Sequence, residues 1–455
     1  MDLFDPADQR PVHFMGVGGA GMSALALLAL RRGVRVTGCD LDCSGADDLR
    51  SLGAALVEGH DAAHVAGSRA LVVTAAVQAA HPELAAAHAQ GVPVVPRKVA
   101  LAGLVNGRTV VAIAGTHGKT TTTVMTTEAL AAAGVAPTGL AGGRVAAWGG
   151  NALIGGDATF VVEADEYDRA FLELRPTVAV VNNVEADHLE IYGTVAAMEA
   201  AFADFAGRAP TVLCGADDDG ARRLAAALGA RARLVGLADD AHVPVRDVRT
   251  DADGTTATVM LPRAGAVTLR LGVPGLHNVR NAAMALAVTD ALGAPVSRAL
   301  DALAAFRGVG RRFERVGEAR GVQVVDDYAH HPTELEVTLA AARQAFPGRR
   351  LVAVFQPHLF SRTQVHGEAM GRALAAADVV VVTEIYGARE QPVPGVSGRA
   401  VAEASGRAGR TAHFEPDRAA VTGTVAGLVR AGDVVLTLGA GDITRVGPEL
   451  VRALA

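Results

Sequence analysis

The chain has 455 residues, and because domains usually span about 100 to 200 residues we expect three of them. Hydrophobic residues make up 50% of the chain, yet no apolar run approaches the roughly 20 residues that cross a bilayer, and the N-terminus MDLFDPADQR is too acidic for a signal peptide. The net charge of −6 comes without a basic block. The sequence therefore predicts a cytoplasmic protein with small-molecule partners, no nucleic acid and no membrane.

The chain has three cysteines, Cys39, Cys43 and Cys214. Three cysteines cannot form a disulfide framework, and Cys39 with Cys43 lacks the second ligand pair that the spacing of a zinc site requires. We therefore expect reduced thiols.

Residues 1–107 alternate short β-rich runs with alanine- and leucine-rich helices, from VHFMGV and MSALALLALRRG to HPELAAAHAQG, which predicts a parallel sheet. Between the first strand and helix, GVGGAG (residues 16–21) matches the dinucleotide fingerprint G-x-G-x-x-G, and Asp40 follows where a ribose partner should lie. The backbone of Gly18, Gly19, Ala20 and Gly21 would cradle a diphosphate at the helix N-terminus. Taken alone, this loop also fits an NAD-dependent oxidoreductase.

A second series opens with TVVAIA and the loop GTHGKTTTT, residues 115–123. The loop offers backbone N–H groups, a lysine and hydroxyls at a helix N-terminus, and its spacing G-x-x-G-K-T is shorter than the Walker pattern. Lysine occurs only twice, at Lys98 and Lys119, which is a mild pointer to Lys119. We expect a nucleoside triphosphate site formed by Gly115, Thr116, His117, Gly118, Lys119, Thr120 and Thr121.

Acidic residues follow the next two predicted strands, in EADEYD (163–168) and in EADH (185–188). Carboxylates at the carboxyl ends of parallel strands, beside a triphosphate loop, are where magnesium is held. We expect metal binding through Thr120, Glu163 and His188, against the alternative of ordinary solvated loops.

The remaining chain continues the alternation after an interruption. DADGTTATVM (251–260) followed by AVTLRLGV predicts a hairpin, and a third βα series runs from VQVVDDY to DVVLTLGAGD. The glycine turn LGAGDI (438–443) could be either a ligand contact or a tight connection. The restarts place domain boundaries near residues 107 and 308.

The chain resembles the Mur ligase family over nearly its whole length. The matching stretches occur in the family's order: GVGGAGMS, GTHGKTTTT, EADEYD, NNVEADHLEIYG, PGLHNVRNA, FRGVGRRFE, DDYAHHPTE, VFQPHLFSRT and EIYGARE. The resemblance implies an α/β protein of three domains: a Rossmann-like domain for the UDP-sugar (1–107), a central P-loop ATPase-like domain with a mostly parallel sheet (108–307), and a C-terminal Rossmann-like domain that positions the amino acid (308–455). It also implies that GVGGAG holds the diphosphate of the UDP-sugar.

The activity that the resemblance implies is an ATP- and Mg²⁺-dependent ligation in peptidoglycan precursor synthesis. L-alanine would be joined to the lactyl carboxylate of UDP-N-acetylmuramate through an acyl phosphate, with Lys119, Glu163 and His188 as catalytic residues. The nucleotide would also meet His277, Asn278, Asn281 and Arg311, with Arg312 near the domain junction. The substrate pocket would include Asp327, Tyr328, His330, His331, His358 and Arg362. Substrate contact is a better expectation for the His-His-Glu334 group than a transition metal.

Several alternatives stay open. Tyr167 stands where many alanine-adding members have serine, which leaves as runner-up a murein peptide ligase that attaches a recycled tripeptide to the same UDP-sugar. No lysine follows Lys119, so the carbamoylated lysine of the ligases that add later residues is excluded. A non-catalytic nucleotide-sugar sensor and an oxidoreductase are the other classes. No uracil contact is assigned to Ala75 or Ala76, and we expect a monomer or weak dimer whose domains close on substrates.

Overall fold

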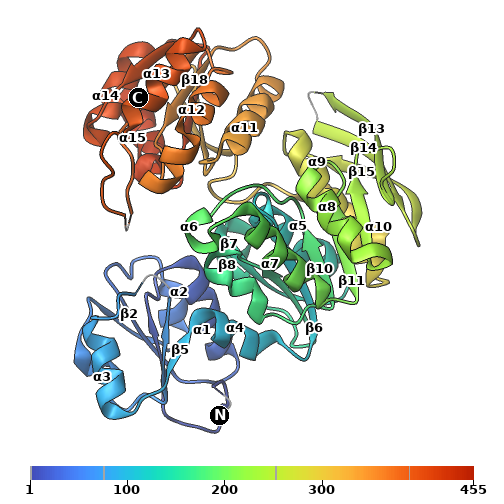
Figure 1. Ribbon diagram of the computed structural model, residues 1–455, viewed down its shortest axis with the longest axis vertical. Coiled ribbons are helices and arrows are strands. Elements are labelled where there is room, and N and C mark those ends of the chain that lie inside the picture. Colours follow the sequence, from blue (N-terminus) through green and yellow to red (C-terminus); the bar gives the residue numbers. More distant parts are fainter. Residues whose placement is uncertain (1–2, 75–76, 252–253, 389) are drawn as a thin grey trace. The chain divides into compact units, whose positions relative to one another are not determined.

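The computed structural model describes residues 3–74, 77–251, 254–388 and 390–455. The chain forms two compact units. The first comprises Met1–Arg246, Thr258–Leu269 and Arg280–Leu303, and the second comprises Asp247–Ala257, Arg270–Val279 and Ala304–Ala455. Figure 1 follows the chain from blue to red. In the described part of the chain, helices long and apolar enough to span a membrane are absent. Ala75 and Ala76 lie outside the described residues.

The N-terminal sheet is entirely parallel, with the order β3-β2-β1-β4-β5. Its strands are β1 (Val12–Met15), β2 (Val36–Asp40), β3 (Ala55–Glu58), β4 (Ala70–Val73) and β5 (Val94–Pro96). Its helices are α1 (Ala20–Arg31), α2 (Asp47–Ser51), α3 (Pro82–Gln90) and α4 (Arg97–Val105), with the 3₁₀ turn η1 (Ala62–Val65). The strand order reverses at β1, and such switch points are where open α/β sheets bind ligands.

The central sheet has the order β15-β14-β13-β12-β11-β10-β6-β9-β7-β8. Its strands are β6 (Thr109–Ala114), β7 (Thr138–Val145), β8 (Gly150–Leu153), β9 (Thr159–Glu163), β10 (Val178–Val181), β11 (Thr211–Gly215), β12 (Ala232–Gly236), β13 (Val243–Asp251), β14 (Gly254–Leu261) and β15 (Gly265–Leu271). The connecting helices are α5 (Lys119–Ala132), α6 (Leu189–Tyr192), α7 (Val195–Gly207), α8 (Asp219–Leu228), α9 (Leu276–Ala291) and α10 (Val296–Ala305), with 3₁₀ turns η2 (Ala146–Trp148), η3 (Tyr167–Glu173) and η4 (Gly229–Arg231). β14 and β15 are neighbours, as the predicted hairpin requires.

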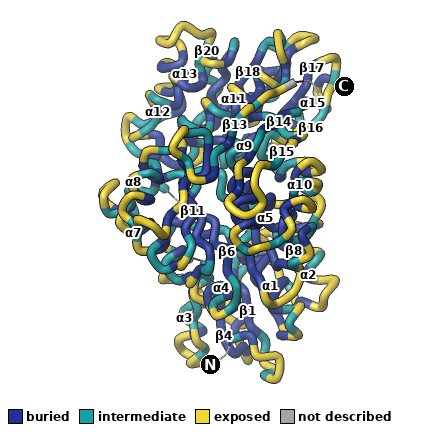
Figure 2. Tube along the Cα trace, turned by 90° about the vertical axis from the view of Figure 1, so that its right-hand side faces the viewer, coloured by how far each residue is buried: buried dark blue, intermediate teal, exposed yellow. Residues whose placement is uncertain are grey.

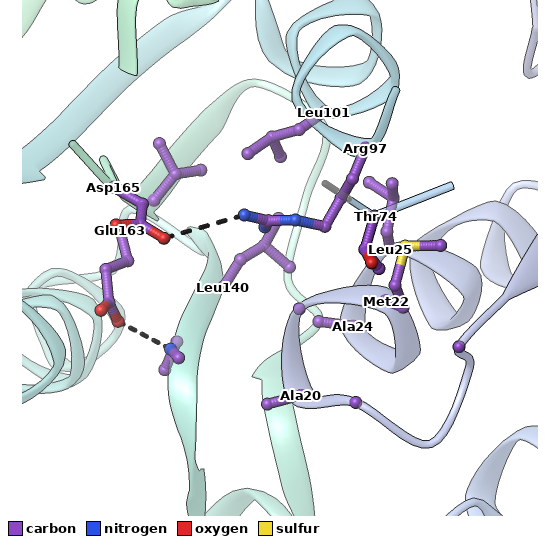
Figure 3. Close-up of a pocket in the computed structure, with 16 residues that line it drawn as sticks. Ala20, Met22, Ala24, Leu25, Thr74, Arg97, Leu101, Leu140, Glu163 and Asp165 are labelled. Atoms are coloured by element: carbon purple, nitrogen blue, oxygen red, sulfur yellow. Dashed lines mark hydrogen bonds and ion pairs between the residues drawn. The ribbon is translucent and has the colours of Figure 1, made fainter. Parts of the chain in front are cut away.

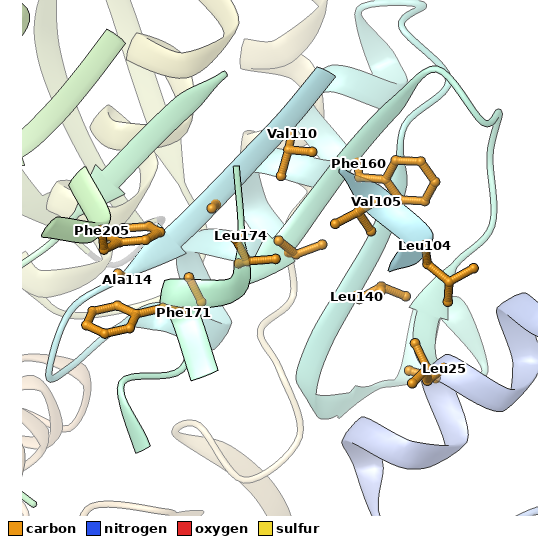
Figure 4. Packing of buried hydrophobic residues seen from close by; sticks show 14 of the residues in the cluster. Leu25, Leu104, Val105, Val110, Ala114, Leu140, Phe160, Phe171, Leu174 and Phe205 are labelled. Carbon is orange, nitrogen blue, oxygen red and sulfur yellow. The ribbon is translucent and has the colours of Figure 1, made fainter. Parts of the chain in front are cut away.

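Helix α1 explains how the N-terminal and central sheets share one core. Its residues from Met22 to Ala29 are all buried, so the helix is apolar on every side and must be covered on more than one. It packs against β7 and β8 as well as against its own sheet. Figure 4 shows Leu25 of α1 beside Leu140 of β7, in the cluster that continues to Phe160 of β9. The most deeply buried strands of this core, such as β1 and β6, are dark blue in Figure 2.

The C-terminal sheet, in the second unit, has the order β16-β17-β21-β18-β19-β20 and is parallel except at β16. Its strands are β16 (Glu314–Ala319), β17 (Val322–Asp327), β18 (Leu351–Phe355), β19 (Val379–Val382), β20 (Thr411–Phe414) and β21 (Val434–Leu438). Its helices are α11 (Pro332–Ala345), α12 (Phe360–Leu374), α13 (Gly398–Arg407), α14 (Arg418–Leu428) and α15 (Val446–Leu454), with η5 (Asp442–Arg445). Leu351–Phe355 and Val434–Leu438 are buried throughout, as strands covered on both faces must be.

The predicted α/β class with mostly parallel sheets is confirmed. The antiparallel pairs β7–β8 and β16–β17 were not predicted, because short strands at sheet edges lack a distinct period. The predicted boundaries near residues 107 and 308 fall in the connections α4–β6 and α10–β16, and as domain limits they stay predictions.

Candidate active site

The phosphate-type loop between β6 and α5 requires its glycines. Gly115 and Gly118 have φ values of +136° and +77°, which side chains strongly disfavour. A Cβ on Gly118 would also lie 2.9 Å from Oδ1 of Asn281. The loop therefore presses closely against α9, and Asn281, one of the predicted nucleotide contacts, lies beside it.

Lys119 opens helix α5 and turns back over the loop. Its Nζ donates to the carbonyl of Gly115 at 2.7 Å and to Oε1 of Glu166 at 2.8 Å. Burial by itself lowers the pKa of Lys119, but the carboxylates of Glu166, Asp165 and Glu163 outweigh it, so the pKa is raised above its ordinary value. The ammonium is thus held charged at the mouth of the loop.

Glu163, at the end of β9, lies directly against the loop. Its Oε1 accepts from the Thr120 hydroxyl at 3.1 Å and its Oε2 from the backbone N–H of Gly142 at 2.7 Å. A carboxylate and a hydroxyl are hard oxygen donors of the kind that Mg²⁺ takes. Thr120 and Glu163 therefore fit the predicted magnesium site.

His188 belongs to a separate polar group. It opens α6 with φ of +53°, its Nδ1 lies 3.3 Å from Oε1 of Glu190, and its Nε2 lies 3.7 Å from Oδ2 of Asp187. Its ring meets the edge of the Tyr167 ring at 5.3 Å between centroids. Both ring nitrogens face carboxylates, and the metal role of His188 stays a prediction.

Two asparagines that follow β10 support the loop and were not predicted. Asn183 accepts from the His117 N–H at 2.7 Å, and Asn182 donates to the Thr122 hydroxyl at 3.0 Å. That hydroxyl in turn donates to Asn281 at 3.1 Å. The paired asparagines in NNVEADH at a strand end were the available signal.

Strand β2 supports the GVGGAG loop through hydrogen bonds. Gly16 donates to the Cys39 carbonyl at 2.8 Å, and Gly18 donates to Oδ2 of Asp40 at 2.9 Å. A Cβ on Gly18 would lie 2.5 Å from the carbonyl of Asp42. The carboxylate predicted to meet a ligand therefore braces the loop itself. Helix α1 begins after Gly19 without a side-chain cap, and a helix N-terminus of this kind favours an anion.

A pocket of about 350 Å³ extends from this loop to the central sheet. Gly16, Gly19, Ala20 and Gly21 line one end, and Glu163 with Asp165 line the other. Arg97, at the start of α4, reaches into it, with Nη2 3.9 Å from Oδ2 of Asp165 (Figure 3). The sequence did not single out Arg97, since it stands in no motif. The pocket joins the first glycine loop to the carboxylate that bonds Thr120 of the second.

The second unit gathers the predicted histidines of its own motifs. The ring of His330 lies 5.4 Å from that of Tyr328 and 6.2 Å from that of His358. Nη1 of Arg362 lies 3.4 Å from Nδ1 of His358. Glu334 accepts from the backbone N–H groups of His330 and His331, so it caps α11.

Asp327 and Arg311 hold the backbone of the second unit. Asp327 accepts from the N–H groups of Phe313 and Ala329, both at 2.8 Å, and burial raises its pKa to about 6. Arg311 donates to the carbonyl of Gly439 at 2.7 Å, so its guanidinium fixes the LGAGDI turn. A direct nucleotide contact of Arg311 stays a prediction.

His277 and Asn278 open helix α9. The amide of Asn278 donates to the Pro274 carbonyl at 2.7 Å, a local contact that closes the turn before the helix. Their predicted roles near the nucleotide therefore stay predictions.

A Rossmann-like glycine loop, whose pocket extends to a carboxylate bonded to a lysine-bearing phosphate loop, is typical of enzymes that use ATP on a nucleotide-linked substrate. Comparison with known proteins makes the class specific. Residues 11–109 match the family described as "Mur ligase family, catalytic domain", residues 113–289 "Mur ligase middle domain", and residues 311–441 "Mur ligase, glutamate ligase domain". The chain belongs to the Mur ligase family.

Individual relatives cover almost the whole chain. The UDP-N-acetylmuramate–L-alanine ligase of Kineococcus radiotolerans is 49% identical over 98% of this chain and 96% of its own length. The crystal structure of the UDP-N-acetylmuramate–alanine ligase MurC of Thermotoga maritima has a TM-score of 0.83 at 30% identity, covering 97% and 98% of the two chains. A murein peptide ligase of Psychrobacter arcticus has a TM-score of 0.72 at 25% identity, with 98% of each chain covered.

Proposed function

We propose that this chain is an ATP-dependent ligase that joins L-alanine to the lactyl carboxylate of UDP-N-acetylmuramate, giving UDP-N-acetylmuramoyl-L-alanine, ADP and phosphate. The observation that carries the proposal is the pocket that runs from the GVGGAG loop to Glu163, whose carboxylate accepts from the Thr120 hydroxyl of the second loop. The two substrates are taken from the names of relatives that are 45% and 49% identical to this chain.

The UDP-sugar occupies the end of the pocket formed by GVGGAG. The first N–H groups of α1 bind the diphosphate, and Arg97 supplies the positive charge that the loop itself lacks. Asp40 holds Gly18 in place. The acid end of the sugar then points along the pocket toward the phosphate loop.

ATP occupies the loop from Gly115 to Thr121. A carboxylate is a poor acyl donor because its leaving oxygen is too basic, so the γ-phosphoryl group is first transferred to it, giving an acyl phosphate that the amine of L-alanine then attacks with loss of phosphate. The Lys119 ammonium moves from Glu166 to the phosphates and stabilises their charge. The residues of the site bind and align the substrates, and none of them forms a covalent bond with a substrate.

Thr120 and Glu163 would hold Mg²⁺, whose contribution is to neutralise charge on the phosphates. In the second unit, we assign recognition of the amino acid to the polar groups of Asp327, Tyr328, His330, His358 and Arg362. The reaction belongs to peptidoglycan precursor synthesis in the cytoplasm.

Phosphate release from ATP and Mg²⁺ with UDP-N-acetylmuramate tests the proposal. L-alanine is offered in one series and the tripeptide L-Ala-γ-D-Glu-meso-diaminopimelate in another. We expect release only with L-alanine. Release only with the tripeptide would establish the murein peptide ligase, which Tyr167 keeps as the second candidate, and release with neither would refute both activities.

A further inference from the structure

A buried polar cluster lies in the N-terminal sheet, outside the pocket described above. It consists of His13 on β1, Cys39 on β2, His64 on η1 and Glu83 on α3, and we call it the His-Cys-Glu cluster. One ligand atom from each residue lies within 4.8 Å of every other. These elements lie in the blue and light-blue part of Figure 1. None of the four residues lines the pocket.

We propose that the His-Cys-Glu cluster binds one divalent transition-metal ion of the zinc class in a closed, structural site.

The distances fit such an ion. In a tetrahedral zinc site, bonds of about 2.0 to 2.3 Å place neighbouring ligand atoms roughly 3.3 to 3.6 Å apart. Sγ of Cys39 lies 3.2 Å from Oε1 of Glu83, Nδ1 of His64 lies 3.2 Å from the same oxygen, and Nε2 of His13 lies 3.6 Å from Oε2. Cys39 and His64 hydrogen-bond Glu83 at these separations, which are also close to the edges of a coordination tetrahedron.

His13 provides an independent indication. Its side chain is 2% exposed, and its Nε2 has no hydrogen-bond partner among the described residues. Its other nitrogen, Nδ1, lies 2.8 Å from the Thr37 hydroxyl, which orients the ring so that Nε2 faces Glu83. A histidine ligand held by a second polar group at its far nitrogen is the usual arrangement at metal sites.

Charge balance points the same way. Glu83 is fully buried, and its ion-pair partners are the imidazoles of His13, His60 and His64. A divalent ion bound by a thiolate, a carboxylate and two neutral imidazoles has zero net charge, which a buried site favours. Thiolate and imidazole nitrogen are ligands that select zinc-class ions over magnesium. Four protein ligands leave no open position, so the site is structural.

The location gives the ion a role. The Cys39 carbonyl accepts from Gly16 and Val17 of the glycine loop, at 2.8 and 3.1 Å, while its thiol faces the cluster. An ion would tie β1, β2, η1 and α3 together directly beneath that loop. This inference does not depend on the proposed ligase activity.

Cobalt(II) reconstitution tests it. The full-length, untagged protein is stripped with a chelator, checked for folding by circular dichroism, and titrated with Co²⁺ in the absence of nucleotide. We expect one Co²⁺ per chain, with intense visible bands of tetrahedral cobalt and a thiolate-to-cobalt charge-transfer band. Zn²⁺ should displace the Co²⁺ and raise the thermal unfolding midpoint. A folded protein that takes up no ion, or binds Co²⁺ without the thiolate band, overturns the proposal.

Matched variants assign the ligands. Cys39→Ser should abolish the charge-transfer band, whereas Cys214→Ser, at another buried free cysteine, should keep it. Because Cys39→Ser could impair folding, His64→Gln, on the partly exposed η1, is the second variant. It should weaken Co²⁺ binding by about a hundredfold or more, since loss of even an outer partner costs about 10- to 100-fold. Retention of the band by Cys39→Ser, or unchanged affinity in His64→Gln, would refute the assignment.

Discussion

The two glycine loops of the first unit have the same strand–loop–helix form and differ in their charged partners. GVGGAG carries no cation, and its acidic neighbour Asp40 bonds to the loop backbone, while Arg97 reaches the pocket from α4. GTHGKT carries Lys119 in the loop itself, with Glu166 and Glu163 against it. This difference supports the proposal that the first loop binds a phosphate group of the substrate and the second stabilises the phosphoryl group that is transferred.

Lys119→Ala tests the GTHGKT loop, which we expect to stabilise phosphoryl transfer. Of all the variants, this one should reduce the activity most. Removing the ammonium should lower kcat for L-alanine-dependent phosphate release by roughly 10³-fold, because charge on the transferring group loses its main protein partner. Lys98→Arg is the control at the other lysine, which bonds Asp168 at 3.0 Å, and should stay within about threefold. Equal losses in both variants would contradict the distinction.

Glu163→Gln keeps the shape of the side chain and removes its charge. We expect kcat to fall about 100-fold and the Mg²⁺ concentration needed for half-maximal rate to rise, since a neutral amide is a weaker ligand for a hard cation. Glu128→Gln, on the same helix as Thr120 and bonded to Trp148, is the matched control. A Mg²⁺ titration curve identical to that of the unaltered enzyme would remove Glu163 from the metal site.

Arg97→Met tests the GVGGAG loop, which we expect to bind the UDP-sugar without taking part in phosphoryl transfer. Loss of one charged hydrogen bond, worth about 1.5 to 3 kcal/mol, should raise the KM for UDP-N-acetylmuramate about 10- to 100-fold and leave the KM for ATP nearly unchanged. Arg31→Met, exposed at the far end of α1, should change neither. A rise confined to the KM for ATP would reverse the assignment of the two loops.

Asp40→Asn should have the smallest effect. The amide oxygen can still accept from Gly18, so a bracing role predicts a change of about threefold or less in the KM for the UDP-sugar. An increase above about tenfold, measured at constant ionic strength, would instead make Asp40 a direct contact to the ligand.

Much of the fold could be predicted because strands buried on both faces are continuous apolar runs. VVAIA, VAVV and VVLTL indicated their strands directly, and each glycine loop lay between a predicted strand and helix. The edge strands β8 and β16 could not be predicted, since their residues are partly exposed and their pairing depends on partners elsewhere in the chain. The protein contacts of Arg311 and His188 could not be predicted for the same reason: polar side chains have several possible partners, and only packing selects among them.

The sequence by itself determined the α/β alternation, the two phosphate-type loops and the identity of Lys119, because these depend on residues close together in the chain. Tertiary structure alone decided that Glu166 holds Lys119, that Arg97 enters the pocket, and that Asp40 braces a loop. It also brought His13, Cys39, His64 and Glu83 together, although their spacing matches no zinc motif. The physical reason is that parallel strands bring residues far apart in sequence side by side in a sheet. Where such residues are buried, their polar atoms need partners, and those partners come from other parts of the chain.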